Sequence, residues 1–129
     1  MMRPFLRAKI HRATVTRSEL DYVGSITIDT DLLDAADLLA TEQVDVYNIT
    51  RGTRFTTYCI PGRAGQGEIG VNGAAAHLAE VGELIIVAAY CWLDREEIPE
   101  HRARVVLVDE ANHVREIREC TPFDSPDST

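Results

Sequence analysis

Short apolar segments interrupted by polar residues, glycines and prolines are the feature of this sequence that most restricts its fold. Between residues 6 and 10, apolar and basic side chains alternate with the two-residue period of a half-buried strand. After Arg12 the alternation shifts by one residue, and a β-bulge near His11 and Arg12 would explain the shift. The pattern therefore favours many short strands.

The other predicted elements are short as well. Further strands are expected over residues 25–29, 44–49, 54–60, 68–71, 83–92, 102–108 and 114–120. A helix is expected over residues 31–39 with Asp29 or Thr30 as its N-cap, and Gly82 is expected to end a helical stretch over residues 74–81. Many short strands with two short helices predict a mainly β fold, a small barrel.

A chain of 129 residues is long enough for one compact domain with its own core, which we expect over residues 1–120. Residues 61–67, with three glycines and a proline, are predicted to be a surface loop, and residues 94–100 an acidic loop. The segment 121–129 is rich in Pro, Asp and Ser and is predicted to be a disordered tail.

The charge and the polar composition exclude several classes of function. A net charge of −8 and a single lysine, Lys9, argue against a nucleic-acid partner. The three cysteines form no paired motif and the four histidines have no ligand spacing, so we expect a reducing cytoplasm and no metal. The longest apolar run, residues 84–93, is about half of a membrane-spanning helix, so no membrane association is expected.

Four segments carry the chemical information of the chain. They are Lys9-Ile10-His11-Arg12, Tyr22-Val23-Gly24-Ser25, Arg54-Phe55-Thr56-Thr57-Tyr58 and Val71-Asn72-Gly73-Ala74-Ala75-Ala76. In this order and spacing they resemble the pyruvoyl-dependent aspartate decarboxylase family over residues 1–120. The resemblance implies a double-psi β-barrel and a homotetramer with active sites between neighbouring subunits. It also implies self-cleavage between Gly24 and Ser25 into residues 1–24 and 25–129, and leaves open whether a maturation factor assists.

The chemistry of decarboxylation explains why such a cleavage is needed. Loss of the α-carboxylate of an amino acid leaves a carbanion, which requires an electron sink that ordinary side chains do not provide. One lysine offers little for pyridoxal phosphate, whereas a pyruvoyl ketone can be made from Ser25 when its hydroxyl attacks the Gly24 carbonyl. Glycine at position 24 lets the backbone adopt a strained conformation and admits the attacking oxygen. The reaction implied is L-aspartate to β-alanine and CO2, for pantothenate (coenzyme A) biosynthesis.

The segment 54–58 supplies candidates for substrate chemistry. The planar fork of Arg54 suits a carboxylate, of which aspartate has two. By resemblance Tyr58 returns a proton to the substrate, and Thr57 acts in processing and substrate contact. Strand alternation places Arg54, Thr56 and Tyr58 on one face and Thr57 on the other. A bulge, or a site approached from both faces at a subunit boundary, would reconcile these positions.

The turn at Asn72 and Gly73 places free backbone N–H groups at a helix start, where anions bind. By resemblance Gly73, Ala74 and Ala75 contact substrate, and Asn72 lies near the pyruvoyl group. An ordinary N-capped helix would give the same pattern. The same resemblance implies that Lys9 is a cation of the substrate site, although alternating basic residues usually form a solvated strand face.

Two other functions are compatible with the same sequence. One is a β-barrel that has kept the fold without processing and binds a partner or a small acid. The other is a pyruvoyl decarboxylase acting on glutamate, which differs from aspartate by one methylene. Mass spectrometry of the purified chain distinguishes the first of these from a self-cleaving enzyme.

Overall fold

A computed structural model describes residues 1–21 and 24–123. Residues 22 and 23, which begin the cleavage motif, lie outside the described residues. The predicted disordered tail also falls mostly outside them, since only its residues 121–123 are described.

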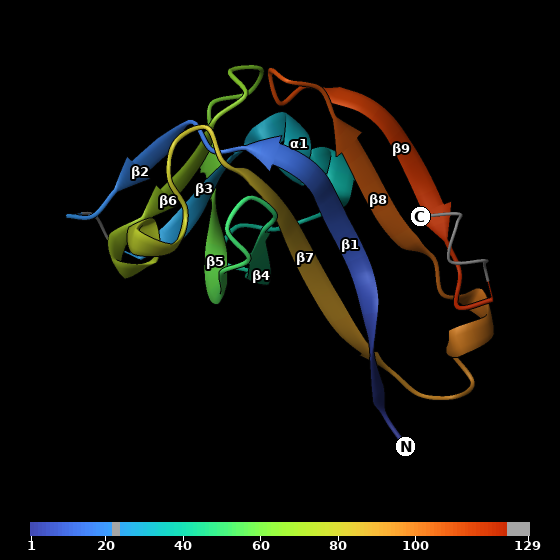
Figure 1. The fold of residues 1–129 in the computed structure, drawn as a ribbon. Helices are drawn as coiled ribbons and strands as arrows, with labels where there is room; N and C mark the ends of the chain where they lie inside the picture. The colour runs from blue at the N-terminus through green and yellow to red at the C-terminus, as the bar shows by residue number, and fades with distance from the viewer. Residues whose placement is uncertain (22–23, 124–129) are drawn as a thin grey trace.

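Nine strands make up most of the described chain (Figure 1). They are β1 (Arg3–Thr14), β2 (Arg17–Glu19), β3 (Ser25–Asp29), β4 (Gln43–Asn48), β5 (Arg54–Gly62), β6 (Ile69–Asn72), β7 (Leu84–Leu93), β8 (Ala103–Val108) and β9 (Val114–Cys120). The helical segments are α1 (Thr30–Ala36) and the 3-10 segments η1 (Gly73–Leu78) and η2 (Ile98–Glu100). The predicted mainly β class with short helices is confirmed.

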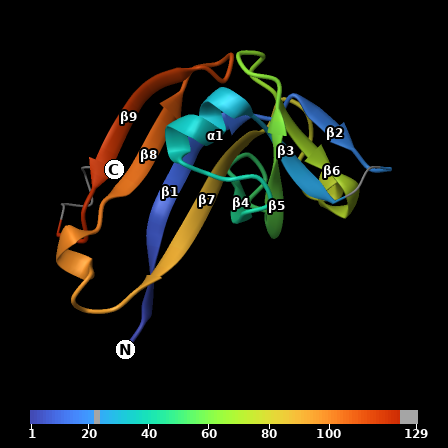
Figure 2. The ribbon, with the colours of Figure 1, turned by 180° about the vertical axis from the view of Figure 1, so that it is seen from behind.

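The strands are hydrogen-bonded in the order β2-β6-β3-β5-β4-β7-β1-β8-β9, so the ladder is open at β2 and β9. Three neighbouring pairs run parallel, β1 with β8, β2 with β6 and β3 with β5. The sheet nevertheless curls, because the chain after β1 returns to β6 (Figures 1 and 2). There the Thr16 N–H donates to the Ile69 carbonyl at 2.8 Å, and the Thr16 hydroxyl oxygen accepts from the Ile69 N–H at 2.9 Å.

The apolar core lies on one face of this curled sheet. Ile10, Val87, Val46 and Phe55 form one row across β1, β7, β4 and β5, and all four belong to the core or pack against it. Helix α1 packs against β1 and β8 and covers the core there (Figure 2). Its side chains Leu32, Leu33 and Ala36 are buried. Each such buried aliphatic side chain contributes about 1.5–3 kcal/mol. On each strand, the residues directly before and after the row member therefore point to the opposite face of the sheet.

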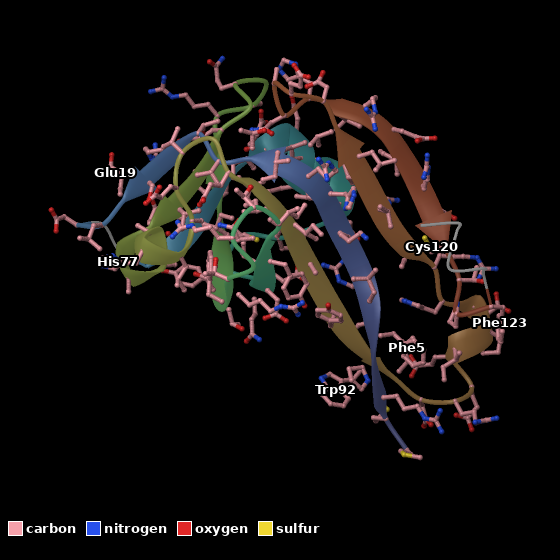
Figure 3. All side chains as sticks on the ribbon, in the orientation of Figure 1. Phe5, Glu19, His77, Trp92, Cys120 and Phe123 are labelled. Atoms are coloured by element: carbon pink, nitrogen blue, oxygen red, sulfur yellow. The ribbon has the colours of Figure 1, made fainter. Side chains whose placement is uncertain are left out.

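Labelled side chains mark two separate parts of the sheet (Figure 3). Glu19 and His77 lie at the end formed by β2, β6 and η1, whereas Phe5 and Trp92 lie at the far end of the β1–β7 pair. The predicted bulge in β1 is confirmed, because the pairing with β7 shifts between His11 and Ala13 and Arg12 has φ 65°.

Several predicted boundaries were wrong. Helix α1 ends at Ala36 rather than Leu39, because Asp37 takes the left-handed conformation that an Asp tolerates. Leu39 is consequently 69% exposed. Strand β2 was not predicted, and β5 continues through Gly62 into the segment expected to be a loop. The expected acidic loop contains the η2 turn, and η1 ends at Leu78.

Candidate functional site

The hydroxyl of Ser25 is held by a buried amide. Ser25 opens β3 and pairs with Asn72 at the end of β6, and both residues are 0% exposed. The Asn72 Nδ2 lies 3.0 Å from the Ser25 Oγ and 3.0 Å from the Thr27 Oγ1, so the amide donates to two hydroxyls. The buried Asn72 Oδ1 has no hydrogen-bond partner among the described residues. The structure thus brings Asn72 to Ser25, where the family resemblance places it.

Gly24 lies in an exposed bend directly before β3. Beyond the two residues adjacent to it in the chain, a Cβ at Gly24 would meet no described heavy atom within 4 Å. Crowding by the surrounding fold is therefore not the reason for glycine here. Conformational freedom at the cleavage site stays the predicted reason.

Tyr58 lies beside Ser25 across a parallel strand pair. Ile26 of β3 pairs with Cys59 of β5, and both side chains are buried in the core. One residue earlier on each strand, Ser25 and Tyr58 face the opposite side of the sheet, and continuation of the same register would make them neighbours at the strand separation of about 4.8 Å. Tyr58 is half-buried. The proposed proton donor and the cleavage serine therefore share one face of neighbouring strands.

Thr57 faces the other way. It pairs with the core residue Val44, and the pairing of β5 is regular with both β4 and β3. A bulge in β5 is therefore excluded as the explanation for its predicted role. Strand β5 also contacts η1, and Ala75 of η1 packs against the core. Of the two alternatives, approach to the site from both faces is the one compatible with this strand.

The turn into η1 differs from the predicted capped helix. Asn72 occupies the N-cap position in an extended conformation but makes no side-chain cap hydrogen bond: its Nδ2 donates to Ser25 and Thr27, and its Oδ1 accepts from no described group. Gly73 follows at φ 71°, a conformation that favours glycine. Ala74 is exposed and Ala75 half-buried. The three residues predicted to contact substrate thus start directly beside the Ser25–Asn72 pair.

Arg54 is positioned by an aromatic side chain that the sequence analysis missed. Its guanidinium carbon lies 4.7 Å from the centroid of the Tyr47 ring, a cation–π contact. The Tyr47 and Tyr90 hydroxyls are 2.7 Å apart. Burial, followed by this hydrogen bond, raises the pKa of Tyr47 to about 12. The hairpin pairs Tyr47 with Arg54, so counting back from the turn could have identified it.

Arg54 forms no ion pair with the residues that the structure describes. It is exposed at the start of β5. Its fork is therefore available to a carboxylate ligand.

Lys9 is not brought to the other candidates within one chain. It pairs with Ala88 of β7, which in turn pairs with Asp45 of β4. Two strands thus separate β1 from β5, which places the Lys9 backbone about 14 Å from that strand along the sheet. Ser25 lies one strand further along the ladder.

Two further features concern cofactors and membranes. Within residues 1–21 and 24–123 no cluster of His, Cys, Asp and Glu side chains could hold a metal ion. None of the helices in these ranges has the length and apolar character required to cross a bilayer.

Comparison with known proteins places the chain in a family. Residues 1–115 match the sequence model of a family described as aspartate decarboxylase. The aspartate 1-decarboxylase of Ralstonia pickettii (strain 12J) is 50% identical over 119 residues, which cover 92% of this chain and 99% of that protein.

Two other relatives have the same description. The aspartate 1-decarboxylase of Caulobacter vibrioides is 54% identical over 115 residues, 89% of this chain and 98% of the relative. That of Mycolicibacterium smegmatis is 54% identical over 114 residues, 88% of this chain and 84% of the relative. The mainly β structure agrees with this assignment, and the chain belongs to the aspartate decarboxylase family.

Proposed function

We propose that this chain is an aspartate 1-decarboxylase that makes its own pyruvoyl group by cleavage between Gly24 and Ser25 and converts L-aspartate to β-alanine and CO2. Family membership supports the reaction. The observation that carries the cleavage is the buried Ser25 hydroxyl, which receives a 3.0 Å hydrogen bond from the Asn72 amide.

Cleavage uses the chain's own atoms and one water molecule. The Ser25 Oγ attacks the Gly24 carbonyl carbon, the C–N bond breaks, and the hydroxyl proton ends on the Ser25 nitrogen, which leaves an ester. Removal of the α-proton of residue 25 then breaks the Cβ–Oγ bond, releasing Gly24 as a carboxylate and leaving a dehydroalanine. Water adds to this group and ammonia departs, which leaves a ketone at the new N-terminus.

The residues around position 25 fit such a group. Asn72 has a buried Oδ1 without a described partner, and its Nδ2 lies 3.0 Å from the Oγ that departs with Gly24, so after cleavage this N–H would be free to donate to the new ketone oxygen. A pyruvoyl group supplies an electron sink for the bond to the departing carboxylate. Asn72 and Thr27 keep polar contacts at this buried position, where an unpaired polar group would be costly.

The side chains around position 25 have different roles toward the substrate. Tyr58, on the strand beside Ser25, donates a proton to the substrate carbon that has lost its carboxylate. Arg54 binds a substrate carboxylate through its fork. Backbone N–H groups from Gly73 to Ala75 and the Thr57 side chain bind the substrate from the other side.

Lys9 completes the site from a neighbouring subunit. Its separation from β5 within one chain supports an assembly in which one subunit supplies Lys9 and the next supplies Ser25 and Tyr58. The proposed assembly is a homotetramer in the cytoplasm, built from single domains of residues 1–120. Its β-alanine serves pantothenate and coenzyme A biosynthesis, and the cleavage proceeds either alone or with a maturation factor.

The test is intact-mass spectrometry of the purified protein before and after warming, with and without cell extract. Wild-type protein is expected to give a fragment of residues 1–24 and a larger one with pyruvoyl at position 25, and to release β-alanine from L-aspartate. Ser25→Ala is expected to stay whole and inactive. A wild-type chain that remains intact under every condition would contradict the proposal and favour a binding protein.

A further inference from the structure

The Asn72 amide that holds Ser25 has a second anchor. Its Nδ2 donates at 3.0 Å to the Ser25 Oγ and at 3.0 Å to the Thr27 Oγ1. Thr27 is 7% exposed and stands two residues after Ser25, so both hydroxyls project from the same face of β3. Thr27 therefore fixes the direction in which the amide points.

A charged pair, formed by Arg17 of β2 and by Glu68 just before β6, extends this contact. Arg17, Gly70 and Thr27 form one row across β2, β6 and β3. Because Gly70 has no side chain, the guanidinium lies across it, and a Cβ there would be 2.8 Å from the Arg17 Nη2. The Arg17 Nη2 is 3.4 Å from the Thr27 Oγ1, at the long limit of a hydrogen bond.

Glu68 holds the guanidinium in this place. Its Oε2 accepts a hydrogen bond from the Arg17 Nη1 at 2.6 Å. The pair is partly exposed, with 39% of the Arg17 side chain and 22% of the Glu68 side chain accessible. The contacts thus run without a break from a surface ion pair to the serine hydroxyl.

We propose that Thr27, supported by Arg17, is a positioning residue for the self-cleavage, because it holds the Asn72 amide in the orientation that donates to the Ser25 Oγ. This inference rests on the proposed function. An N–H donor on the Oγ stabilises the negative charge that develops there when the hydroxyl gives up its proton. Without Thr27 the second N–H of a buried amide is unpaired, and rotation of the amide removes the donor from Ser25.

The experiment follows the loss of full-length chain after cell-free synthesis, so that every variant starts unprocessed. Thr27→Val keeps the shape but removes the hydroxyl, and cleavage is expected to slow about 10-fold. Thr27→Ser restores a hydroxyl and is expected to cleave within about twofold of wild type. Thr30→Val is the matched control, because its hydroxyl donates to the Gly62 carbonyl away from Asn72.

Substitutions at Gly70 and Arg17, which lie in one row with Thr27, test the inference independently. Gly70→Ala displaces the Arg17 guanidinium without changing any charge, and Arg17→Met removes the charge but keeps the length. Each is expected to slow cleavage about threefold, because the 3.4 Å contact is weaker than the one to Asn72. Folding is compared by thermal unfolding in a Ser25→Ala background, where all chains stay whole.

The outcomes separate this inference from the proposed function. Slow Thr27→Val with rapid Thr27→Ser, at equal melting temperatures, is the result expected. Cleavage of Thr27→Val at the wild-type rate, or equal slowing in Thr27→Ser, would overturn the positioning role and leave the self-cleavage in place. A wild-type chain that never cleaves would overturn both.

Discussion

At the scale of single residues, the outward face of β5 carries the two side chains proposed to act on the substrate. Tyr58 stands beside Ser25 on the neighbouring strand, whereas Arg54 lies four residues earlier, against Tyr47. The two positions predict different losses when each side chain is changed.

Tyr58→Phe is expected to cleave at the normal rate, because the processing steps do not use the phenol. Turnover of L-aspartate is expected to fall about 100-fold or more, the usual contribution of a general acid. Steady-state kinetics on fully processed protein measures this. Near-normal turnover of Tyr58→Phe would assign the proton donation to another group or to water.

Arg54→Lys keeps the positive charge but loses the planar fork and the stacking on Tyr47. With processing unchanged, kcat/KM for L-aspartate is expected to fall on the order of 30- to 1,000-fold. L-glutamate measured in parallel shows whether the fork also selects substrate length. Arg51→Lys is the control, since Arg51 pairs with Glu83 instead. An unchanged kcat/KM would make Arg54 a solvated hairpin charge.

At the scale of elements, the end of β3 connects α1 to the loop after β5 through one carboxylate. Asp29 is 1% exposed and accepts from the Asp31 N–H at 2.8 Å, the Gly65 N–H at 3.1 Å and the Gly67 N–H at 2.7 Å. It is thus the N-cap of α1 and also the anchor of this loop.

Asp29→Ala is expected to lower the free energy of unfolding by about 2–4 kcal/mol, because it removes the cap and leaves two loop donors unpaired. Urea unfolding in a Ser25→Ala background measures the change on intact chains. Asp31→Ala, at an exposed position of the same helix, is the control and should cost about 0.5 kcal/mol. Equal losses in the two variants would show that the cap and loop contacts contribute little.

At the scale of the whole molecule, the curled sheet separates residues that the reaction would need together. Lys9 lies on β1, whereas Ser25 and Tyr58 lie on β3 and β5, with β4 and β7 between. The site proposed to include all three is therefore expected to be shared between two copies of the chain.

Mixed oligomers test this arrangement. Lys9→Gln and Tyr58→Phe are each expected to process and to be nearly inactive alone. Co-expressed in equal amounts, they should regain about a quarter of wild-type activity, because a quarter of shared sites combine an intact Lys9 with an intact Tyr58. The activity of co-purified mixed oligomers is compared with that of the two proteins purified separately and then pooled. No gain on co-expression would place each site within a single chain.

The local pattern was sufficient to predict most strands, the bulge at Arg12 and the hairpin of β4 and β5. Side-chain alternation and turn residues act over a few neighbouring positions, so the strands and turns that they determine can be predicted from the sequence. The same alternation correctly put Arg54 and Tyr58 on one face and Thr57 on the other. The motifs also sufficed to indicate the family to which the chain belongs.

Tertiary structure decided what depends on distant segments. The three-residue β2 is too short for a periodic signal and exists because it pairs with β6. Only that pairing places Arg17 over Gly70 and beside Thr27, and only the β3–β6 register turns Asn72 from a helix cap into a partner of Ser25. Strand order likewise separates Lys9 from the serine. Register and order are set by the packing of the whole core, which no local pattern specifies.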